Sequence, residues 1–390
     1  MKRSPSGLAR FVLDNSLLLL AGTVAAVVWA NLDFGSYDRI AHPLHFVVND
    51  IGMVFFFALA AKEVFEATLP GGALASPRRA FSPLAAAVGG MVLPALIYLG
   101  LTWARGPADL ARGWAIPCAT DIAFSAMVAR IVFPAGHPAI PFLLLLAIAD
   151  DALGLIILAV FYPSGALSFS ALAVLMAAAV LLAVWLRRSG VQSFWPYVLG
   201  PGVLSWAALY TGGFHPALAL VPIVPFMPHS RRDFGVFDER EEDQPDTLNK
   251  FEHWWATPVQ AVLLVFGFAN AGVPFAAIGA GTYYVLAGLL LGKPIGILAF
   301  SGMARLAGGH LPPGLRVSDL LVLGLVAAIG FTVSLFFATA AFPAGGALAE
   351  TKMGALLSFV AAPIAVAVSR MLRVRASPQP EAGSVYKPAR

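Results

Sequence analysis

The chain has 390 residues, of which 59% are hydrophobic and only 12% are charged, and its formal net charge is +4. Its mean hydropathy of +0.81 lies far above that of an ordinary globular protein and excludes a soluble domain. The small positive net charge does not indicate binding to nucleic acid. The single cysteine excludes an intramolecular disulfide and any multi-cysteine metal site. The composition therefore predicts an all-α polytopic membrane protein.

About twelve apolar stretches are long enough to cross a hydrocarbon core of about 30 Å as helices of roughly 20 residues. The predicted spans begin near Phe11, Leu44, Phe81, Gly113, Ile140, Ser168, Phe194, Phe214, Trp255, Tyr283, Leu320 and Ala355. They make residues 1–375 one transmembrane domain. A polar stretch at 229–250 carries both charge signs and is predicted to be a cytoplasmic loop, and 376–390 is predicted to be a disordered tail.

The basic residues predict the orientation of these spans. An even number of spans places both termini on one side, and cytoplasmic loops of membrane proteins carry an excess of Lys and Arg. With both termini in the cytoplasm, only four of the 25 basic residues fall in extracellular loops: Arg39, Arg105, Arg112 and Lys352. The first span contains Asp14 and Asn15 and lacks a convincing cleavage site, so it is predicted to be retained rather than removed as a signal peptide.

Two adjacent carboxylates, Asp150 and Asp151, lie in the middle of the span that begins near Ile140. A charged residue near the bilayer centre costs at least ~2.5–3.5 kcal/mol on insertion scales, so such residues usually have a partner and a function. Successive residues of an α-helix point about 100° apart, so the two carboxylates cannot line one narrow face equally. We expect one of them to meet a partner and the other to face water.

Lys293 is the predicted partner, because it is a lone cation within the span that begins near Tyr283. A lysine that snorkels to a helix end is the simpler alternative. A buried carboxylate binds protons readily, whereas a nearby ammonium or metal cation favours its ionised form. Protons and a small cation would then compete for one carboxylate. That competition is an antiport mechanism when the site opens to only one side at a time.

Two spans contain residues that interrupt a helix. Pro117 removes a backbone donor in the fourth span, where Thr120 and Asp121 are also poor residues to bury, and Gly330 lies at the weak point of the eleventh. Freed carbonyls and half-helix ends are tolerated only beside protein groups or a water-filled cavity. Asp121 could neutralise such an end. The sequence predicts that helices 4 and 11 are broken.

The two broken spans occupy matching places in the chain. Residues 81–162 and 283–372 each hold three spans, and the broken one is the middle member of each set. Their positions in the chain give the two sets opposite topology, as in secondary transporters built from inverted repeats. The sequence therefore predicts two inverted repeats of three helices.

Seven short motifs, spread nearly from end to end, resemble one known family. They are Val48–Asp50, Gly113–Phe124, Ala147–Gly154, Phe251–His253, Phe268–Val273, Gly292–Gly296 and Ile329–Ser334. Taken together, they are highly specific. The chain resembles the NhaA family of bacterial sodium/proton antiporters, itself one of the inverted-repeat folds.

The resemblance implies an electrogenic, pH-regulated antiporter of the bacterial inner membrane that exports Na⁺ or Li⁺ in exchange for more than one proton, by alternating access and without a cofactor. By motif position, Asp151 is the main cation ligand and Asp150 the carboxylate that pairs with Lys293. Thr120 and Asp121 lie where the broken helices cross. Five further residues are implied to line the cytoplasmic funnel or to respond to pH: Asp50, Glu63, Glu252, His253 and His215.

Two features depart from the family pattern. After Glu63 the chain continues Val-Phe-Glu-Ala, where the family pattern has basic residues, so the resemblance does not give the pH threshold. The connection between Ala30 and Asn49 leaves little room for the extracellular hairpin through which some members dimerise. A homodimer, the Na⁺/Li⁺ preference and the stoichiometry are therefore left open.

Three other functions would use similar residues. A sodium-coupled carrier of organic anions with the same broken-helix fold would need a roomier cavity and a second ion site. An intramembrane aspartyl protease needs its aspartates on separate helices, whereas Asp150 and Asp151 share one. A passive channel is disfavoured because carboxylates paired with Lys293 indicate a gated site rather than an open ring. The sequence thus favours a secondary active transporter over an enzyme.

Overall fold

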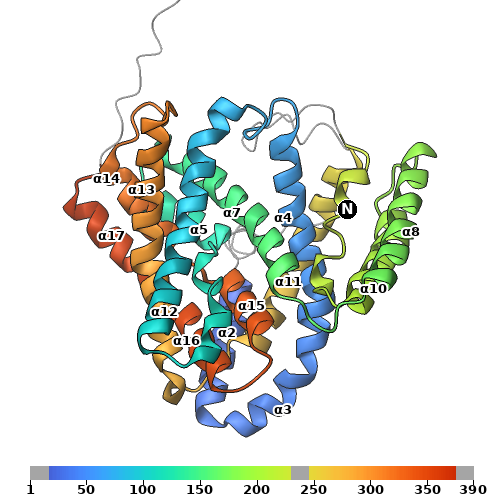
Figure 1. Ribbon diagram of the computed structural model, residues 1–390, viewed down its shortest axis with the longest axis horizontal. Coiled ribbons are helices and arrows are strands. Elements are labelled where there is room, and N and C mark those ends of the chain that lie inside the picture. The colour runs from blue at the N-terminus through green and yellow to red at the C-terminus, as the bar shows by residue number, and fades with distance from the viewer. Residues whose placement is uncertain (1–16, 230–245, 375–390) are drawn as a thin grey trace, which may run out of the picture.

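The computed structural model describes residues 17–229 and 246–374, and the regular elements within these ranges are all helices (Figure 1). The α-helices are α2 (Leu17–Leu32), α3 (Phe34–His45), α4 (Met53–Thr68), α5 (Pro77–Arg105), α6 (Ile122–Val132), α7 (Ala139–Phe161), α8 (Phe169–Arg188), α9 (Trp195–Tyr197), α10 (Val203–Gly212), α11 (Thr247–Asn270), α12 (Ala280–Ala287), α13 (Lys293–Leu306), α14 (Val317–Ala327), α15 (Phe331–Ala341), α16 (Gly346–Leu357) and α17 (Ala361–Met371). The predicted all-α fold is confirmed.

Most of the predicted spans are helices long and apolar enough to cross a membrane. Six helical stretches of the described chain meet this test singly, and two bent pairs meet it when each pair is taken as one span. The four other predicted spans correspond to α2, to α9 with α10, to residues 214–228 and to α11. The expectation of about twelve crossings is roughly met, and the chain is a multi-pass membrane protein.

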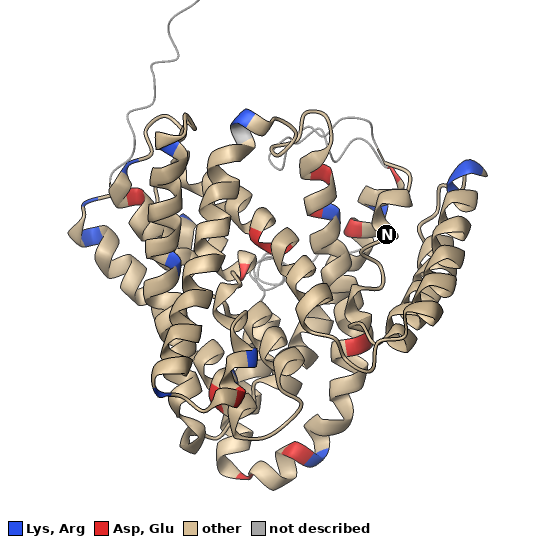
Figure 2. Ribbon diagram, viewed as in Figure 1, with Lys and Arg blue, Asp and Glu red and all other residues tan. Residues whose placement is uncertain are grey.

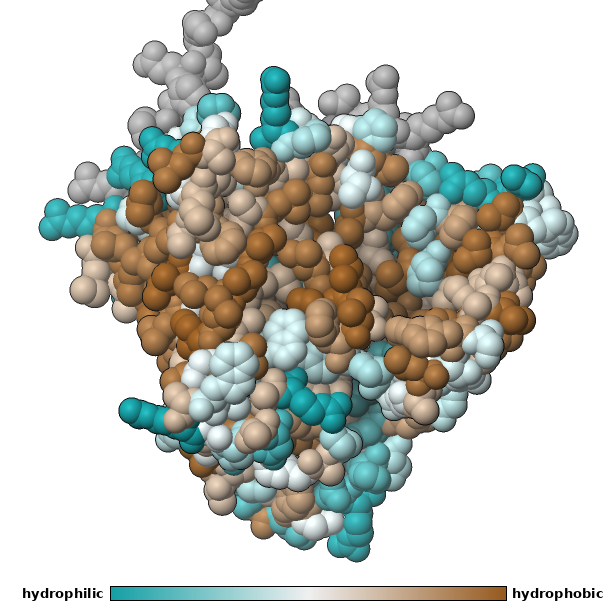
Figure 3. All heavy atoms as spheres, in the orientation of Figure 1, coloured by the Kyte–Doolittle hydropathy of each residue, from teal (hydrophilic) through white to brown (hydrophobic). Residues whose placement is uncertain are grey.

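The surface has the polarity of such a protein. Hydrophobic residues form a broad band across the molecule, and hydrophilic residues gather at the upper and lower ends of the view (Figure 3). Lys and Arg segments are prominent at the upper end, and a small group of acidic segments lies inside the molecule at mid-height (Figure 2). The band corresponds to the hydrocarbon core of the bilayer.

The fourth and eleventh spans are interrupted at mid-length. In the fourth, the 3-10 turns η2 (Ala108–Gly113) and η3 (Ile116–Cys118) precede α6, and the two parts are bent by 54°. In the eleventh, α14 and α15 are bent by 52°. The Asp121 N–H donates to the Ile329 carbonyl at 2.7 Å, so the two breaks meet. The predicted broken helices 4 and 11 are confirmed, and the assignment of repeat boundaries to 81–162 and 283–372 stays a prediction.

The predicted eighth span is not a regular helix. Residues 214–228 form two short 3-10 turns, η5 (Pro216–Leu218) and η6 (Val224–Phe226), which are joined by further turns. Four prolines lie in this stretch, at positions 216, 222, 225 and 228. Each removes a backbone donor and disfavours a continuous helix. The expectation was wrong because hydropathy contains no information about backbone donors.

Helix α11 begins inside the loop predicted at 229–250. The Asp246 side chain accepts a hydrogen bond from the Asn249 N–H at 2.8 Å and caps the helix, which starts at Thr247 rather than near Trp255. The predicted boundary was wrong because polar residues fill the first turns of this helix. Two predicted segments lie outside the described residues: the remainder of the loop at 230–245 and the tail at 376–390.

The connection between the first two spans is itself helical. Helix α3 fills it, beginning after Asp33, whose side chain accepts from the Ser36 N–H at 3.2 Å. The Tyr37 hydroxyl donates to the Phe268 carbonyl at 2.7 Å and so joins α3 to α11. Residues 34–45 therefore form a helix rather than a hairpin, and the question of a homodimer stays open.

A histidine–aspartate contact joins the connection between the fourth and fifth spans to the first turn of the eleventh span. His137, between α6 and α7, places Nε2 at 3.8 Å from Oδ2 of Asp319, which lies in the first turn of α14. Both residues are buried, and His137 Nδ1 accepts from the Ala139 N–H at 3.2 Å. Burial lowers the pKa of His137, the Asp319 carboxylate raises it by less, and the nearby Arg316 lowers it further.

Protonation of His137 is therefore expected to destabilise the fold. Because its pKa is lower in the folded than in the unfolded protein, stability present at neutral pH is lost as the pH falls below about 6.5 towards the folded pKa. His137→Gln should flatten the dependence of the unfolding temperature on pH in detergent, by a few degrees across this window. The exposed His310 offers a control, and His310→Gln should leave the slope unchanged. Equal slopes for wild type and His137→Gln would contradict the expectation.

Candidate functional site

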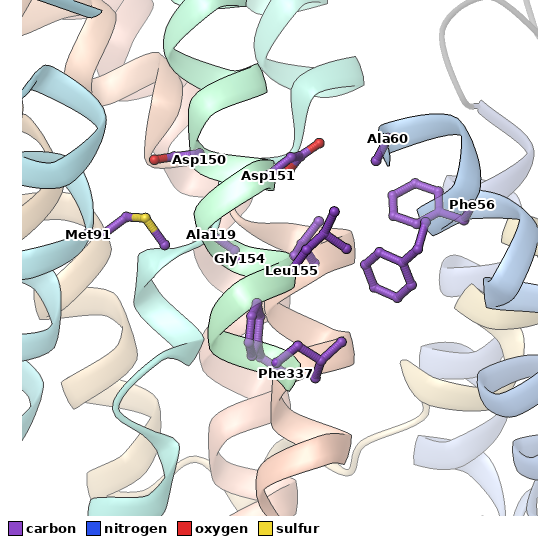
Figure 4. A pocket seen from close by; sticks show the side chains of 12 residues that line it. Phe56, Ala60, Met91, Ala119, Asp150, Asp151, Gly154, Leu155 and Phe337 are labelled. Atoms are coloured by element: carbon purple, nitrogen blue, oxygen red, sulfur yellow. The ribbon is translucent and has the colours of Figure 1, made fainter. Parts of the chain in front are cut away.

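Helix α7 carries Asp150 and Asp151 at its middle, and their side chains point in different directions. Asp150 points towards Met91 of α5, whereas Asp151 points towards Ala60 of α4 (Figure 4). Asp150 is only 3% exposed, while Asp151 is partly exposed. The structure thus separates the two carboxylates into a buried one and an accessible one.

Asp150 forms an ion pair with Lys293. Its Oδ2 lies 2.9 Å from the Lys293 Nζ, and the same oxygen accepts a hydrogen bond from the Thr120 hydroxyl at 2.7 Å. Lys293 also donates to the main-chain carbonyl of Cys118 at 2.5 Å. The second oxygen of Asp150, Oδ1, is buried and has no hydrogen-bond partner among the described residues. One oxygen of this carboxylate is therefore engaged, and the other is free to take a ligand or a proton.

The backbone around Lys293 determines where its side chain points. Lys293 is the first residue of α13 and directly follows the π-helical turn η9 (Gly288–Gly292). One turn later, a Cβ atom on Gly296 would lie only 2.0 Å from the Gly89 carbonyl oxygen of α5. Glycine at 296 therefore allows the two backbones to approach closely. This packing holds the fully buried Lys293 beside the broken fourth span.

Asp121 lies where the two broken spans cross. Its Oδ1 accepts from the Phe124 N–H of α6 at 3.3 Å. Its Oδ2 accepts from the Thr332 N–H of α15 at 3.1 Å and from the Thr332 hydroxyl. A carboxylate at two helix N-termini satisfies orphan N–H donors and complements both helix dipoles. Asp121 therefore caps the second half of both broken spans.

A cavity extends from the two carboxylates along α7. Its lining residues are Phe56, Phe57, Ala60, Met91, Ala119, Asp150, Asp151, Gly154, Leu155, Leu158, Val333 and Phe337. Apart from the aspartates, these residues are apolar. Leu155 and Leu158 follow Asp151 by one and two turns of α7, so the cavity leads towards the C-terminal end of this helix. The carboxylates form its polar end.

Charged residues lie on the other side of Asp151. Glu63 follows Ala60 by one turn of α4, is exposed, and interacts electrostatically with Asp151. The neighbouring Lys62 is buried and forms ion pairs of 2.5 Å with both Glu66 of its own helix and Glu252 of α11. Asp151 thus separates an apolar side from a charged, solvent-accessible one.

Three other predicted residues are spread more widely. Asp50 lies in the π-helical turn η1 (Phe46–Gly52), thirteen residues before Glu63, which is about 20 Å along a helix. His215 is buried, and its ring lies 4.8 Å from that of Phe336, which in turn packs against Phe57 of the cavity lining. His253 is exposed on α11. The structure does not bring Asp50 or His215 to the charged side with Glu63.

Two contacts of the site were missed from the sequence. The side chain of Cys118 is buried, and its carbonyl, which no motif indicated, is the second partner of Lys293. Glu66 was not among the predicted site residues, and it pairs with Lys62. A signal was present in both cases, since a break near Pro117 leaves the last carbonyls before it without helical donors and residues 62 and 66 lie on one helix face.

Comparisons with known proteins place the sequence in a family over most of its length. The sequence model of the family "Na+/H+ antiporter 1" matches residues 12–369. The chain is 48% identical over 374 residues to the Na⁺/H⁺ antiporter NhaA of Desulfitobacterium hafniense, covering 94% of this chain and 96% of the relative. It is 45% identical over 384 residues to the Na⁺/H⁺ antiporter NhaA of Geobacter metallireducens, covering 96% and 100%.

The fold also has a known counterpart. It is similar to the sodium proton antiporter MjNhaP1 from Methanocaldococcus jannaschii, with a TM-score of 0.54 over 92% of each chain. At 16% identity, this likeness concerns the fold alone. The extent of the family match and the identity to its curated relatives confirm the resemblance seen in the motifs. The chain belongs to the NhaA family of Na⁺/H⁺ antiporters.

Proposed function

We propose that this chain works as an electrogenic antiporter of the inner membrane that exports Na⁺ or Li⁺ and admits more than one proton in return. One observation supports this above all. Asp150 is buried against Lys293, while Asp151 is accessible at the polar end of a cavity beside two broken helices. Carboxylate, hydroxyl and carbonyl oxygens suit a hard monovalent cation.

In this proposal Asp151 is the main ligand of the transported cation. The free Oδ1 of Asp150 and the hydroxyl of Thr120 would add oxygen ligands. Asp150 would take and release a proton as its bond with Lys293 breaks and forms. Because the same carboxylates take either the cation or protons, the two ions compete for one site, and this competition couples their movements.

Alternating access would depend on the apolar and charged sides of Asp151. We propose that the apolar cavity closes the extracellular route in this conformation, because a cation cannot cross an apolar lining without its hydration shell. Glu63 and Glu252 would line the cytoplasmic route. Rigid-body movement of the helices around the crossing, held by Asp121, would then expose the site to the other side. This orientation places both termini in the cytoplasm.

The proposed pH regulation has a structural candidate in the Lys62–Glu66–Glu252 group. The family pattern has basic residues after Glu63, and this chain has none there. Lys62, which precedes Glu63, bridges α4 and α11 instead. The exposed His253 follows Glu252 in the chain and is proposed to take part in the response of this group to pH. His215 is proposed to respond to pH as well.

Transport by the purified protein tests this function. Proteoliposomes with an imposed gradient of Na⁺, Li⁺ or K⁺ should show proton movement, followed with a pH-sensitive dye over a range of pH. We expect exchange with Na⁺ and Li⁺ that increases with pH and that generates a membrane potential. Exchange with K⁺ in preference to Na⁺ would overturn the substrate assignment. Exchange that generates no potential would overturn the electrogenic mechanism but not the antiport.

A further inference from the structure

The break in the fourth span leaves carbonyl groups without helical donors, and distant side chains satisfy them. The last carbonyls of a helix have no partner within it, and a buried one must find a donor elsewhere. Here the Ile116 carbonyl accepts a hydrogen bond from the Ser334 hydroxyl of α15 at 2.7 Å. Two residues later, the Cys118 carbonyl accepts from Lys293. Ser334 thus donates to a carbonyl two residues from the one that anchors Lys293.

The break in the eleventh span also leaves carbonyl groups without helical donors, and side chains of the fourth span donate to them. The Val326 carbonyl, at the end of α14, accepts from the Ser125 hydroxyl of α6 at 3.0 Å. The next carbonyl, of Ala327, lies 3.2 Å from the Thr120 hydroxyl. Ser125 of the fourth span therefore donates to the carbonyl next to the one that Thr120 contacts.

The two serines occupy corresponding positions. Ser125 lies four residues after Asp121, the N-cap of α6, and Ser334 lies four residues after Gly330, the N-cap of α15. Both serines are 0% exposed. Each belongs to the second half of one broken span and donates to the first half of the other. The two hydrogen bonds therefore form a reciprocal pair across the crossing.

Gly330 makes room for one of them. A Cβ atom at this position would lie only 2.3 Å from the Ser334 Oγ and 3.0 Å from the Ala119 carbonyl oxygen. Any larger residue would displace the hydroxyl from the Ile116 carbonyl. The helix-breaking glycine of the eleventh span thus also gives Ser334 access to the fourth.

We infer that Ser125 and Ser334 are reciprocal positioning residues, which hold the carbonyl ends of the broken helices so that Lys293 and Thr120 meet Asp150 in the correct geometry. The inference rests on the proposed function and adds two residues to its machinery. Neither serine touches the cation in this scheme. Both act through the backbone segments that hold the residues around Asp150.

The two serines are expected to differ in importance. The Val326 carbonyl has a second donor, the Ile329 N–H at 3.3 Å, so it keeps a partner when Ser125 is removed. The Ile116 carbonyl lies two residues from the Cys118 carbonyl that anchors Lys293, and losing Ser334 removes the side-chain donor seen there. We therefore expect Ser334→Ala to affect transport more than Ser125→Ala.

The test compares serine variants in the proteoliposome assay. Ser334→Ala should raise the KM for Na⁺ about five-fold or more, as expected from loss of a buried hydrogen bond, and should shift the pH of half-maximal exchange by about half a unit or more. Ser334→Cys, which keeps a weak donor, should lie between Ser334→Ala and wild type. Ser301→Ala is the matched control, because Ser301 is 0% exposed and its hydroxyl has no hydrogen-bond partner among the described residues.

The outcomes separate positioning from simple stability. A Ser334→Ala protein that unfolds at lower temperature but keeps the wild-type KM and pH profile would overturn the inference. If Ser334→Ala cannot be purified, Ser334→Cys decides in its place, and a wild-type KM and pH profile in that variant would overturn it too. Wild-type protein that fails to exchange Na⁺ for protons would instead count against the proposed function, independently of both serines.

Discussion

Replacing Asp151 with asparagine is expected to reduce Na⁺/H⁺ exchange in proteoliposomes to the level of liposomes without protein. Asp151 is the accessible member of the carboxylate pair and lies between the apolar cavity and the charged side. An amide keeps the size of the side chain but can neither hold a negative charge for the cation nor carry a titratable proton. Na⁺ binding and proton binding therefore both lose the group on which they depend.

The control for this variant is a carboxylate outside the site. Asp109 is exposed in η2, and Asp109→Asn removes one negative charge without touching the crossing. It should exchange Na⁺ at the wild-type rate. The variants are compared at equal protein content after their folding has been checked by thermal unfolding. Normal exchange by Asp151→Asn would show that the cation ligand lies elsewhere.

Removing the charge of Lys293 is expected to destabilise the folded protein by about 3–5 kcal/mol, the usual effect of removing one partner of a buried ion pair. Lys293 is fully buried and its Nζ lies 2.9 Å from Oδ2 of Asp150. Lys293→Met keeps most of the side-chain volume but leaves Asp150 with Thr120 as its polar neighbour. It also leaves the Cys118 carbonyl without its lysine donor. Thermal unfolding in detergent measures the loss.

A double variant tests whether the stability is lost because Asp150 is left without its partner. Asp150→Asn combined with Lys293→Met should recover much of the lost stability, because two neutral side chains can replace a buried ion pair at little cost. Lys352→Met is the control, since Lys352 is also buried but has no carboxylate within 4.0 Å among the described residues. If Lys293→Met were no more destabilising than Lys352→Met, the pair would not stabilise the fold as expected.

Several features of the fold could be predicted because their causes are local. Pro117 and Gly330 weaken a helix wherever they occur, so the breaks of the fourth and eleventh spans were visible in the chain itself. The different environments of Asp150 and Asp151 could be predicted because successive residues of an α-helix point about 100° apart. Their importance followed from the cost of charge in hydrocarbon.

Other features could not be read from hydropathy. The stretch 214–228 is apolar enough for a span, but its prolines prevent a regular helix. Helix α11 begins at Thr247 because the Asp246 side chain caps it, although its first turns are polar. The direction of the Lys293 side chain could not be predicted either, since it depends on how closely α13 packs against α5.

The sequence by itself determined the class of protein, the two breaks and the carboxylates at the membrane centre, since burial cost and backbone chemistry act within a few residues. Only the tertiary structure decided which groups these residues meet. Asp150 meets Thr120 thirty residues away, and Ser334 meets Ile116 across 218 residues. Such contacts depend on how the broken spans cross, and the crossing is the joint result of packing between many helices.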